Sequence, residues 1–422
     1  MTSLDATNAG QLQHLLREYR ERTPGSETAF RRALRVLPGG ETRAVTTYPP
    51  YPVAIARGRG SRLIDVDGHE YLDLVNNYTS LIHGNAYPPV SAAVTAVLED
   101  GLVFPSPHDR QLELAELLVG RVPSVERVRF TNSGTEASVL AARIAQRATG
   151  RSQLLMFDGG YHGSAPPLLA KDPAVIAVPY NDIDAVQVAL TGEVAAVFAE
   201  PFLGAGGVVP AAPGFLHEVQ ELARSRGALF VLDEVQALRN GIGGEQGRLS
   251  LTPDLTILGK IIGGGLPIGA VGGRADLLLL TASTTRGHLM HSGTFNGHLA
   301  AAAAGAVTLH HLDATDIERL DRAGGFLAER IIQAATRAGL PMSVTRAGSI
   351  LNVHFTSSAP TNAADVRAAA GPLLPALHLA LLLQGVYTTP RGMISLSTVT
   401  SDEEVEAAAV AYENAFNRLN AR

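Results

Sequence analysis

Six short apolar runs between residues 127 and 273 constrain the fold of this chain more than any other feature. Each is rich in Val, Leu, Ile, Ala or Phe and has the length of a buried strand. The runs cover residues 127–131, 154–157, 195–199, 228–233, 255–258 and 268–273. Between several of them apolar residues recur at helical spacing, as at 135–149 and 215–226. Strands that alternate with helices predict an α/β fold with a mostly parallel central sheet, covered on both faces.

The flanking segments predict a second, smaller domain. The run RLIDVDGHEYLDL has the pattern of a β-hairpin that turns at Asp67 and Gly68. After about residue 300 the chain is rich in Ala and Leu and is expected to be helical, with one strand in ILNVHF and a final helix. We expect an N-terminal segment (1–62) that packs with the small domain, a large domain (63–305) and a C-terminal α+β domain (306–422).

Charge and composition exclude several classes of protein. The formal net charge of −6 provides no basic surface for nucleic acid. The chain has no cysteine, which excludes disulfides and zinc–thiolate sites and fits a cytoplasmic location. The N-terminal residues lack the pattern of a secretory signal, and the longest apolar stretch (373–386) is too short to span a membrane.

Chemically useful residues follow five of the six predicted strands. In open α/β sheets, ligands bind beyond the carboxyl ends of the strands. The residues found there are Asn132-Ser133-Gly134-Thr135, the loop Asp158–Gly163 with Tyr161, Glu200, Asp233 to Gln236, and Lys260. Each has an ordinary structural explanation, since a serine can cap a helix and an aromatic ring can pack in a core. Their joint occurrence at strand ends favours a binding site.

Lys260 is unusual because the chain contains so few lysines. Of 34 basic residues only Lys171 and Lys260 are lysines, and Lys260 lies in the apolar, glycine-rich run LTILGKIIGGGLPIGAVGGR. Unlike arginine, lysine can lose its proton near neutral pH and act as an amine nucleophile. Pyridoxal 5′-phosphate requires such a lysine, an acid for its pyridine nitrogen, an aromatic residue for its ring and a helix N-terminus for its phosphate.

The chain resembles the class III aminotransferases of fold type I. The resemblance rests on the stretches LPGGETRAV, DVDGHEYLD, RFTNSGTEA, GGYHG, AEP, LDEVQ, PDLTILGKIIGGGLPIGAVGGR, HSGTFN and YTTPRG, which run from about residue 36 to 398. Within this family the chain is most similar to glutamate-1-semialdehyde aminomutases and to β-amino-acid aminotransferases of the β-phenylalanine type. The resemblance implies the pyridoxal-phosphate-dependent transferase fold, with a large domain and a smaller α+β domain, and a homodimer with shared active sites.

The resemblance also implies a role for each matching residue. Lys260 would form the Schiff base with the cofactor and move the proton, and Asp233 would pair with the pyridine nitrogen. Tyr161 would stack on the ring, Gln236 would lie near its hydroxyl group, and Glu200 is expected nearby. The cofactor phosphate would be bound by Ser133, Gly134 and Thr135, and by Thr294 of the neighbouring subunit.

Two arginines indicate the substrates. In the β-amino-acid aminotransferases, an arginine near PGG binds the carboxylate of the amino donor and one in the segment matching YTTPRG binds the α-keto acid. Arg43 and Arg391 occupy these places, whereas the similar aminomutases lack the second arginine. The pattern predicts transfer from a β-amino acid to 2-oxoglutarate or pyruvate. Candidates for the side-chain pocket are Tyr48, Tyr51, Asn77 and Tyr78.

The sequence is also compatible with other functions on the same fold. An intramolecular aminomutase, a racemase or epimerase and a catalytically silent scaffold all stay open as alternatives. A nicotinamide dehydrogenase is not supported, because each glycine-rich run misses the third glycine of the dinucleotide fingerprint. A serine hydrolase is not supported because no G-x-S-x-G is present. The histidine pairs 288/291 and 310/311 lack the acid partners or the spacing of a metal site, so no metal is expected.

Overall fold

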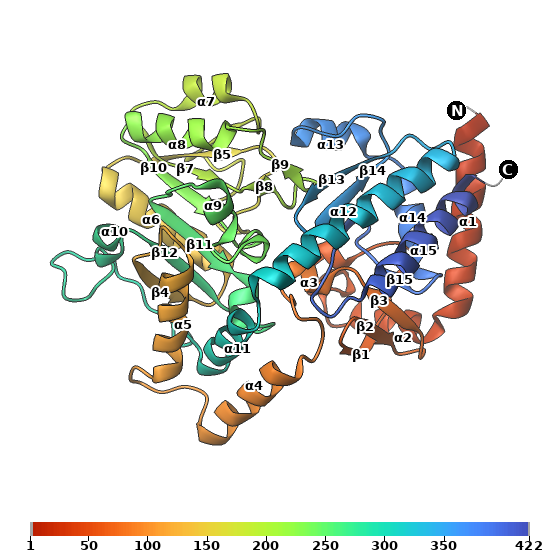
Figure 1. The fold of residues 1–422 in the computed structure, drawn as a ribbon, viewed down its shortest axis with the longest axis horizontal. Helices are drawn as coiled ribbons and strands as arrows, with labels where there is room; N and C mark the ends of the chain where they lie inside the picture. The colour runs from red at the N-terminus through yellow and green to blue at the C-terminus, as the bar shows by residue number, and fades with distance from the viewer. Residues whose placement is uncertain (1–2, 421–422) are drawn as a thin grey trace.

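A seven-stranded sheet forms the centre of the larger lobe in the computed structural model, which describes residues 3–420 (Figure 1). Its strands are, in spatial order, β4 (Arg127–Thr131), β12 (Gly269–Gly273), β11 (Leu255–Gly259), β10 (Leu229–Asp233), β7 (Val194–Ala199), β5 (Gln153–Phe157) and β6 (Val175–Val178). Only β12 runs antiparallel to its neighbours. The other six strands point the same way, which confirms the predicted mostly parallel sheet. Strand β6, in the short run VIAV, was not predicted.

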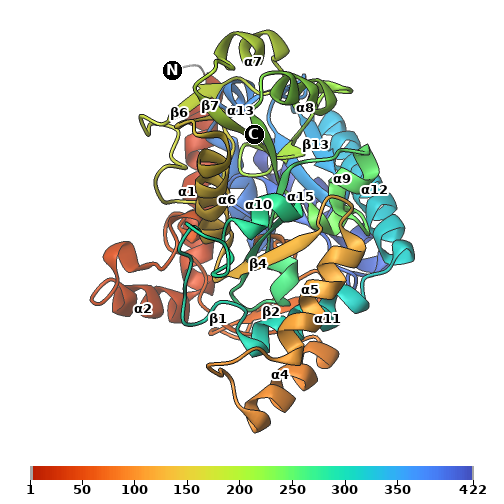
Figure 2. The same ribbon diagram turned by 90° about the vertical axis from the view of Figure 1, so that its left-hand side faces the viewer.

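Alternating residues of the strands face two separate hydrophobic clusters. On one face Leu154 and Val231 pack with residues of α6 (Gly134–Thr149). On the other face Leu155 and Phe230 pack with residues of α7 (Ile183–Ala189) and α8 (Phe215–Ser225). Figure 2 shows α6 on one side of the sheet and α8 on the other. Because both faces of the sheet are buried, most residues of these strands are apolar in the sequence.

The remaining elements of the larger lobe surround this sheet. They are α4 (Pro88–Asp100), α5 (Asp109–Arg121), β8 (Phe202–Leu203), β9 (Val209–Pro210), η3 (Leu238–Asn240), α9 (Gly244–Leu249), η4 (Lys260–Gly263), α10 (Ala275–Leu279) and α11 (Leu299–His310). Helix α11 is almost wholly buried, since it packs against α4, α5 and η4. Among residues 3–420, no helix is both long and apolar enough to cross a membrane.

Two small sheets organise the other lobe. One has the order β13 (Ser343–Ala347), β14 (Ile350–His354) and β16 (Met393–Ser395); the other has β1 (Ile55–Arg59), β2 (Arg62–Asp65), β3 (Glu70–Asp73) and β15 (Val386–Tyr387). The lobe's helices are α1 (Ser3–Arg22), α2 (Pro24–Ala33), α12 (Ala314–Arg337), α13 (Ala363–Ala369), α14 (Leu373–Leu382) and α15 (Asp402–Asn420). The short turns η1 (Pro38–Gly40), η2 (Ala44–Thr46) and α3 (Asn76–Thr79) complete the chain, and α3 contacts β16. The hairpin at 62–73 is confirmed, and β3 pairs in parallel with β15. The proposed domain boundaries remain predictions.

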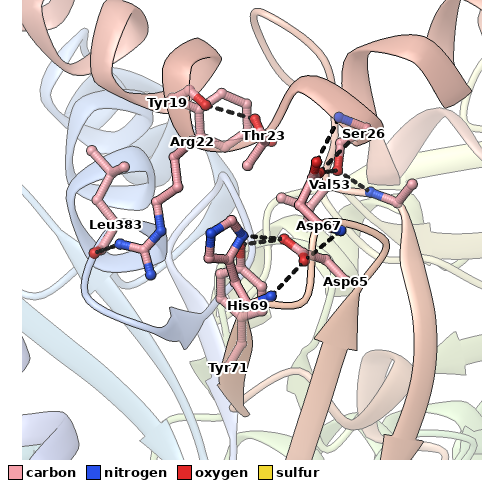
Figure 3. A network of polar contacts seen from close by, with 12 residues as sticks. Tyr19, Arg22, Thr23, Ser26, Val53, Asp65, Asp67, His69, Tyr71 and Leu383 are labelled. Carbon is pink, nitrogen blue, oxygen red and sulfur yellow. Dashed lines mark hydrogen bonds and ion pairs between the residues drawn. The ribbon is translucent and has the colours of Figure 1, made fainter.

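The turn of this hairpin anchors the N-terminal segment (Figure 3). Asp67 Oδ1 accepts a hydrogen bond from the Gly25 N–H at 2.6 Å, and Oδ2 accepts one from the Ser26 N–H at 2.9 Å. These donors lie in the first turn of α2, where a carboxylate is favourable. Asp65 stiffens the turn by accepting from the Tyr71 hydroxyl at 2.8 Å. The first turn of α2 is therefore fixed against the hairpin.

Candidate active site

The residues that follow the parallel strands line one cavity of about 570 Å³. It contains Lys260, after β11, together with residues from the ends of β4, β5, β7 and β10. Of the residues predicted from sequence, the cavity lining includes Arg43, Ser133, Gly134, Thr135, Tyr161, Glu200, Asp233, Gln236, Lys260 and Arg391. Thr294 is exposed and lies outside this lining, so its role toward a partner subunit stays a prediction.

Lys260 stands at the start of η4 in an unusual backbone conformation. Its φ of 52° is in the left-handed region, which a residue with a side chain rarely adopts and which often marks a functional site. Removal from water lowers the pKa of the Lys260 amine to about 8, against the opposing influence of Asp233 and Glu200. At neutral pH the amine therefore exchanges its proton readily, as a nucleophile or a base must.

Asp233 ends β10 and is held by a histidine that was not assigned a role from sequence. Its Oδ2 lies 2.9 Å from His162 Nδ1, and its Oδ1 accepts from the Val235 N–H at 3.0 Å. Burial by itself lowers the pKa of His162, but the hydrogen bond and charge of Asp233 outweigh burial, so this pKa lies above its usual value. The available sequence signal was a histidine directly after Tyr161 in a glycine-rich loop.

Glu200 connects two of the loops that form the cavity. Its Oε2 accepts from the Tyr161 N–H at 2.9 Å and its Oε1 from the Gly204 N–H at 3.2 Å. Burial raises the pKa of this carboxyl to about 7, although the charge of His162 opposes the change. Glu200 is therefore an acid poised near neutral pH, and it fixes the backbone that carries Tyr161.

The N-terminus of α6 also lines the cavity. Ser133 caps the helix, because its Oγ accepts from the Glu136 N–H at 3.2 Å. Gly134 and Thr135 follow in the first turn, whose N–H groups have no partner within a helix and attract anions. Gly163, with φ +124°, approaches so closely that an added Cβ would lie 2.7 Å from Thr135 Oγ1. This backbone makes a close-fitting cradle for a phosphate group.

Arg43 and Arg391 line the cavity on the side of the smaller lobe. Arg43 Nη1 donates to Asn77 Oδ1 at 2.9 Å, and Arg391 Nη1 donates to the Ala205 carbonyl at 3.3 Å. Burial lowers the pKa of Arg391, and Tyr78 and Glu200 oppose this shift. Among residues 10–420, whose side chains the structure describes, neither guanidinium forms an ion pair with a carboxylate. Both therefore keep donors for an incoming anion.

The structure separates the four candidates for the side-chain pocket. Asn77 and Tyr78 line the cavity. Tyr51 does not, because it is 2% exposed in the core of the smaller lobe, with its ring 5.4 Å from that of Tyr19. Tyr48 borders a neighbouring cavity of about 180 Å³ but not the one that contains Lys260. Its ring packs edge-on against His378, 330 residues later in the chain.

A lysine, an acid and a helix N-terminus at one edge of an α/β sheet define a pyridoxal-phosphate-dependent enzyme. The donors present fit that cofactor, with an amine of low pKa at Lys260, a hydrogen-bonded carboxylate at Asp233 and the anion cradle at Ser133 to Thr135. The chain belongs to the class III aminotransferases, since the family model "Aminotransferase class-III" matches residues 44–172 and 170–415. The protein is therefore a pyridoxal-phosphate-dependent enzyme of that family.

Similar proteins come from two branches of the family. The chain is 38% identical to a glutamate-1-semialdehyde 2,1-aminomutase 2 from Geobacillus kaustophilus, over 93% of this chain and 98% of the relative. It superposes on the β-phenylalanine aminotransferase from Variovorax paradoxus with a TM-score of 0.92 and 35% identity, covering 96% of each chain. A transaminase solved with pyridoxal phosphate bound gives a TM-score of 0.87 and 31% identity, covering 94% and 98%.

The rate at which the cofactor-free enzyme takes up pyridoxal phosphate is expected to rise with pH and level off above about 8. Only the neutral amine condenses with an aldehyde, and the Lys260 pKa is lowered to about 8. The neutral fraction should thus increase about thirtyfold between roughly pH 6.5 and pH 9. Stopped-flow absorbance of the visible cofactor band measures this rate. A rate that keeps climbing beyond pH 10 would show an unshifted lysine.

Proposed function

We propose that this enzyme transfers the amino group of a β-amino acid to an α-keto acid, 2-oxoglutarate or pyruvate. The observation that carries the proposal is that Arg43 and Arg391 line the same cavity as Lys260 and have no carboxylate partner among the described residues. A planar guanidinium binds a carboxylate through two parallel hydrogen bonds. Two such groups suit an enzyme that binds two carboxylates in turn, the donor at Arg43 and the acceptor at Arg391.

Each residue of the cavity has a separate role in the proposed reaction. Bound pyridoxal phosphate supplies an aldehyde that captures amines and a ring that withdraws electrons from the substrate carbon. Lys260 would take the proton from the amine-bearing carbon of the substrate, because burial lowers the pKa of its amine to about 8. Asp233, oriented by His162, would place a negative charge at the pyridine nitrogen. The N–H groups of Gly134 and Thr135 would hold the phosphate.

Residues on neighbouring loops would make the remaining contacts with the cofactor ring. Tyr161 would stack on the cofactor ring, and the Glu200 carboxylate fixes the backbone of Tyr161. Gln236 would lie near the ring hydroxyl, and its Nε2 contacts Met393 Sδ at 3.6 Å. These assignments rest on the family resemblance together with the position of all three residues in the cavity lining.

The apolar part of the lining supports an amino donor with an apolar side chain. Val45, Leu266, Pro267 and Ile268 border the cavity along with the ring of Tyr78. Apolar walls bind a hydrocarbon or aromatic group and provide few partners for a charged one. The similar Variovorax paradoxus enzyme is described as a β-phenylalanine aminotransferase, which agrees with this choice of donor.

A second candidate is intramolecular amino transfer of the glutamate-1-semialdehyde type. The name of the Geobacillus kaustophilus relative favours it, and it would use the same lysine, acid and phosphate cradle. Arg391 argues against it, because an enzyme that rearranges one substrate needs no site for a keto-acid partner. The two functions therefore differ in whether a keto acid is consumed.

We also propose that the active enzyme is a homodimer whose subunits share their active sites. Tyr161 lines the cavity yet is 57% exposed, and Phe295, next to Thr294, is 56% exposed. Large rings left in water beside a site are typical of a surface that a partner covers. Thr294 would then reach the phosphate of the partner's cofactor. The mass of the enzyme in solution tests the dimer, and a monomer with full activity would contradict it. A cytoplasmic location remains a prediction.

An absorbance titration distinguishes these functions. β-Phenylalanine is expected to remove the visible band of the purified enzyme, and 2-oxoglutarate or pyruvate is expected to restore it. Glutamate-1-semialdehyde serves as the comparison substrate. If only the semialdehyde changes the spectrum, and turnover needs no keto acid, the aminomutase function replaces the one proposed.

A further inference from the structure

Four consecutive residues with side chains form a left-handed turn at the edge of the cavity. Asn76, Asn77, Tyr78 and Thr79 have φ values of 47°, 48°, 55° and 73°. L-residues pay a steric cost in this region, and a tyrosine followed by a β-branched threonine pays more than asparagine does. Conformations of this kind persist only where the surrounding structure imposes them, and they gather at functional sites.

The turn is imposed by bonds to two other parts of the chain. Asp73 Oδ1 accepts from the N–H groups of Val75 at 2.9 Å and Asn76 at 2.8 Å. The Asn76 Nδ2 donates to the Ser395 carbonyl at 2.8 Å, and the Ser395 hydroxyl donates to the Val75 carbonyl at 3.1 Å. Ser395 belongs to β16, the strand that follows Arg391. The turn is therefore tied to the segment that carries one of the two arginines.

The turn places the Tyr78 ring next to both arginines. The guanidinium carbon of Arg43 lies 5.6 Å from the centre of this ring, and that of Arg391 lies 5.8 Å from it. The Tyr78 hydroxyl donates to the Val45 carbonyl at 2.6 Å, which also fixes the segment after Arg43. Burial raises the pKa of Tyr78, although both arginines oppose the shift. The ring therefore acts as a neutral phenol, whose face attracts cations.

We propose that Tyr78 is a shared positioning residue that holds Arg43 and Arg391 through the face of one ring and so determines the preference for carboxylate-bearing substrates in both halves of the reaction. The inference rests on the proposed function. A ring next to both arginines attracts each guanidinium without using its N–H donors, whereas an acid partner would occupy those donors. It also links the donor and acceptor sites, which would otherwise depend on independent residues.

The test compares matched substrates with and without a carboxylate. For the donor half-reaction the pair is β-phenylalanine and 1-phenylpropylamine, and for the acceptor half-reaction it is 2-oxoglutarate and butanal. Single-turnover absorbance with the holoenzyme gives a ratio of rate constants for each pair. Tyr78→Leu is expected to lower both ratios by about tenfold, the size of a partly desolvated cation–π contact. Tyr78→Phe keeps the ring and should retain both ratios within about twofold.

The outcomes distinguish a failure of the role proposed for Tyr78 from a failure of the proposed enzymatic function. Turnover of 1-phenylpropylamine and butanal reports whether a variant is folded and loaded with cofactor. Tyr87→Leu is the matched control, since this tyrosine also has a bonded hydroxyl and a stacked ring but lies outside the cavity. If wild-type enzyme shows no preference for the acids, the proposed function fails. If the wild-type enzyme prefers the acids and Tyr78→Leu leaves either ratio unchanged, the shared role of Tyr78 is overturned.

A second series keeps the shape of the side chain. Increasingly fluorinated phenylalanine analogues at position 78 weaken the attraction of the ring face for cations while they preserve its size. Both ratios are expected to fall steadily along this series. Ratios that stay constant would show that the ring only fills space, even if the leucine variant does not fold.

Discussion

Lys260→Ala is expected to lower the rate of transamination by about 10³-fold or more. Alanine has no amine to capture the cofactor aldehyde or to move the proton, and general acid–base catalysis alone contributes about 10²–10⁴-fold. The phosphate cradle, Asp233 and both arginines stay in place, so the variant should still bind cofactor and substrate. Single-turnover absorbance with β-phenylalanine measures the loss directly.

Lys171→Ala is the matched control for this experiment. Lys171 is the only other lysine of the chain, is exposed, and lies outside the cavity lining. Its removal deletes the same charge without touching the site, so the rate should stay within about twofold of the wild type. Normal turnover by Lys260→Ala would refute the proposed mechanism. An equal loss in both variants would point to a general effect of lost charge.

The parts of the site that follow from sequence are those carried by the sheet. Short apolar runs identify strands, and parallel strands bring their carboxyl ends to one edge, so the residues after β4, β5, β7, β10 and β11 had to meet. This reasoning places Ser133, Asp233 and Lys260 around one cavity, as observed. The cofactor was inferred from these residues, whereas the family was inferred from longer stretches between about residue 36 and 398.

The parts that sequence did not give depend on contacts between distant segments. The rings of Tyr48 and Tyr51 belong to a core completed by His378 and Tyr19, and no local pattern reveals which way they point. The left-handed turn at Tyr78 is held by Ser395, more than 300 residues away. His162 became recognisable only through its bond to Asp233. In each case the deciding partner lies on another element.

Arg391→Met is expected to raise the KM for 2-oxoglutarate by about 10²-fold and to leave the donor half-reaction nearly unchanged. Methionine keeps much of the apolar stem but removes the charged fork, and hydrogen bonds to charged groups contribute about 1.5–3 kcal/mol each. The effect is large because Arg391 is partly buried in the cavity wall, so that water replaces the lost contact poorly. The two half-reactions can be measured separately by loss and recovery of the visible absorbance band.

The reciprocal variant, Arg43→Met, tests which arginine binds the donor and which binds the acceptor. Arg43→Met should weaken the binding of β-phenylalanine and leave the binding of the keto acid unchanged. Arg322→Met is the control, because Arg322 lies on an exposed part of α12 outside the cavity, and it should change the binding of neither substrate. If Arg391→Met impairs the donor instead, the two carboxylate sites are exchanged. If it leaves the keto acid unaffected, Arg391 is not the acceptor site, and its presence no longer argues against the aminomutase reaction. Under the proposed function, the difference between the two branches of the family depends on one partly buried guanidinium.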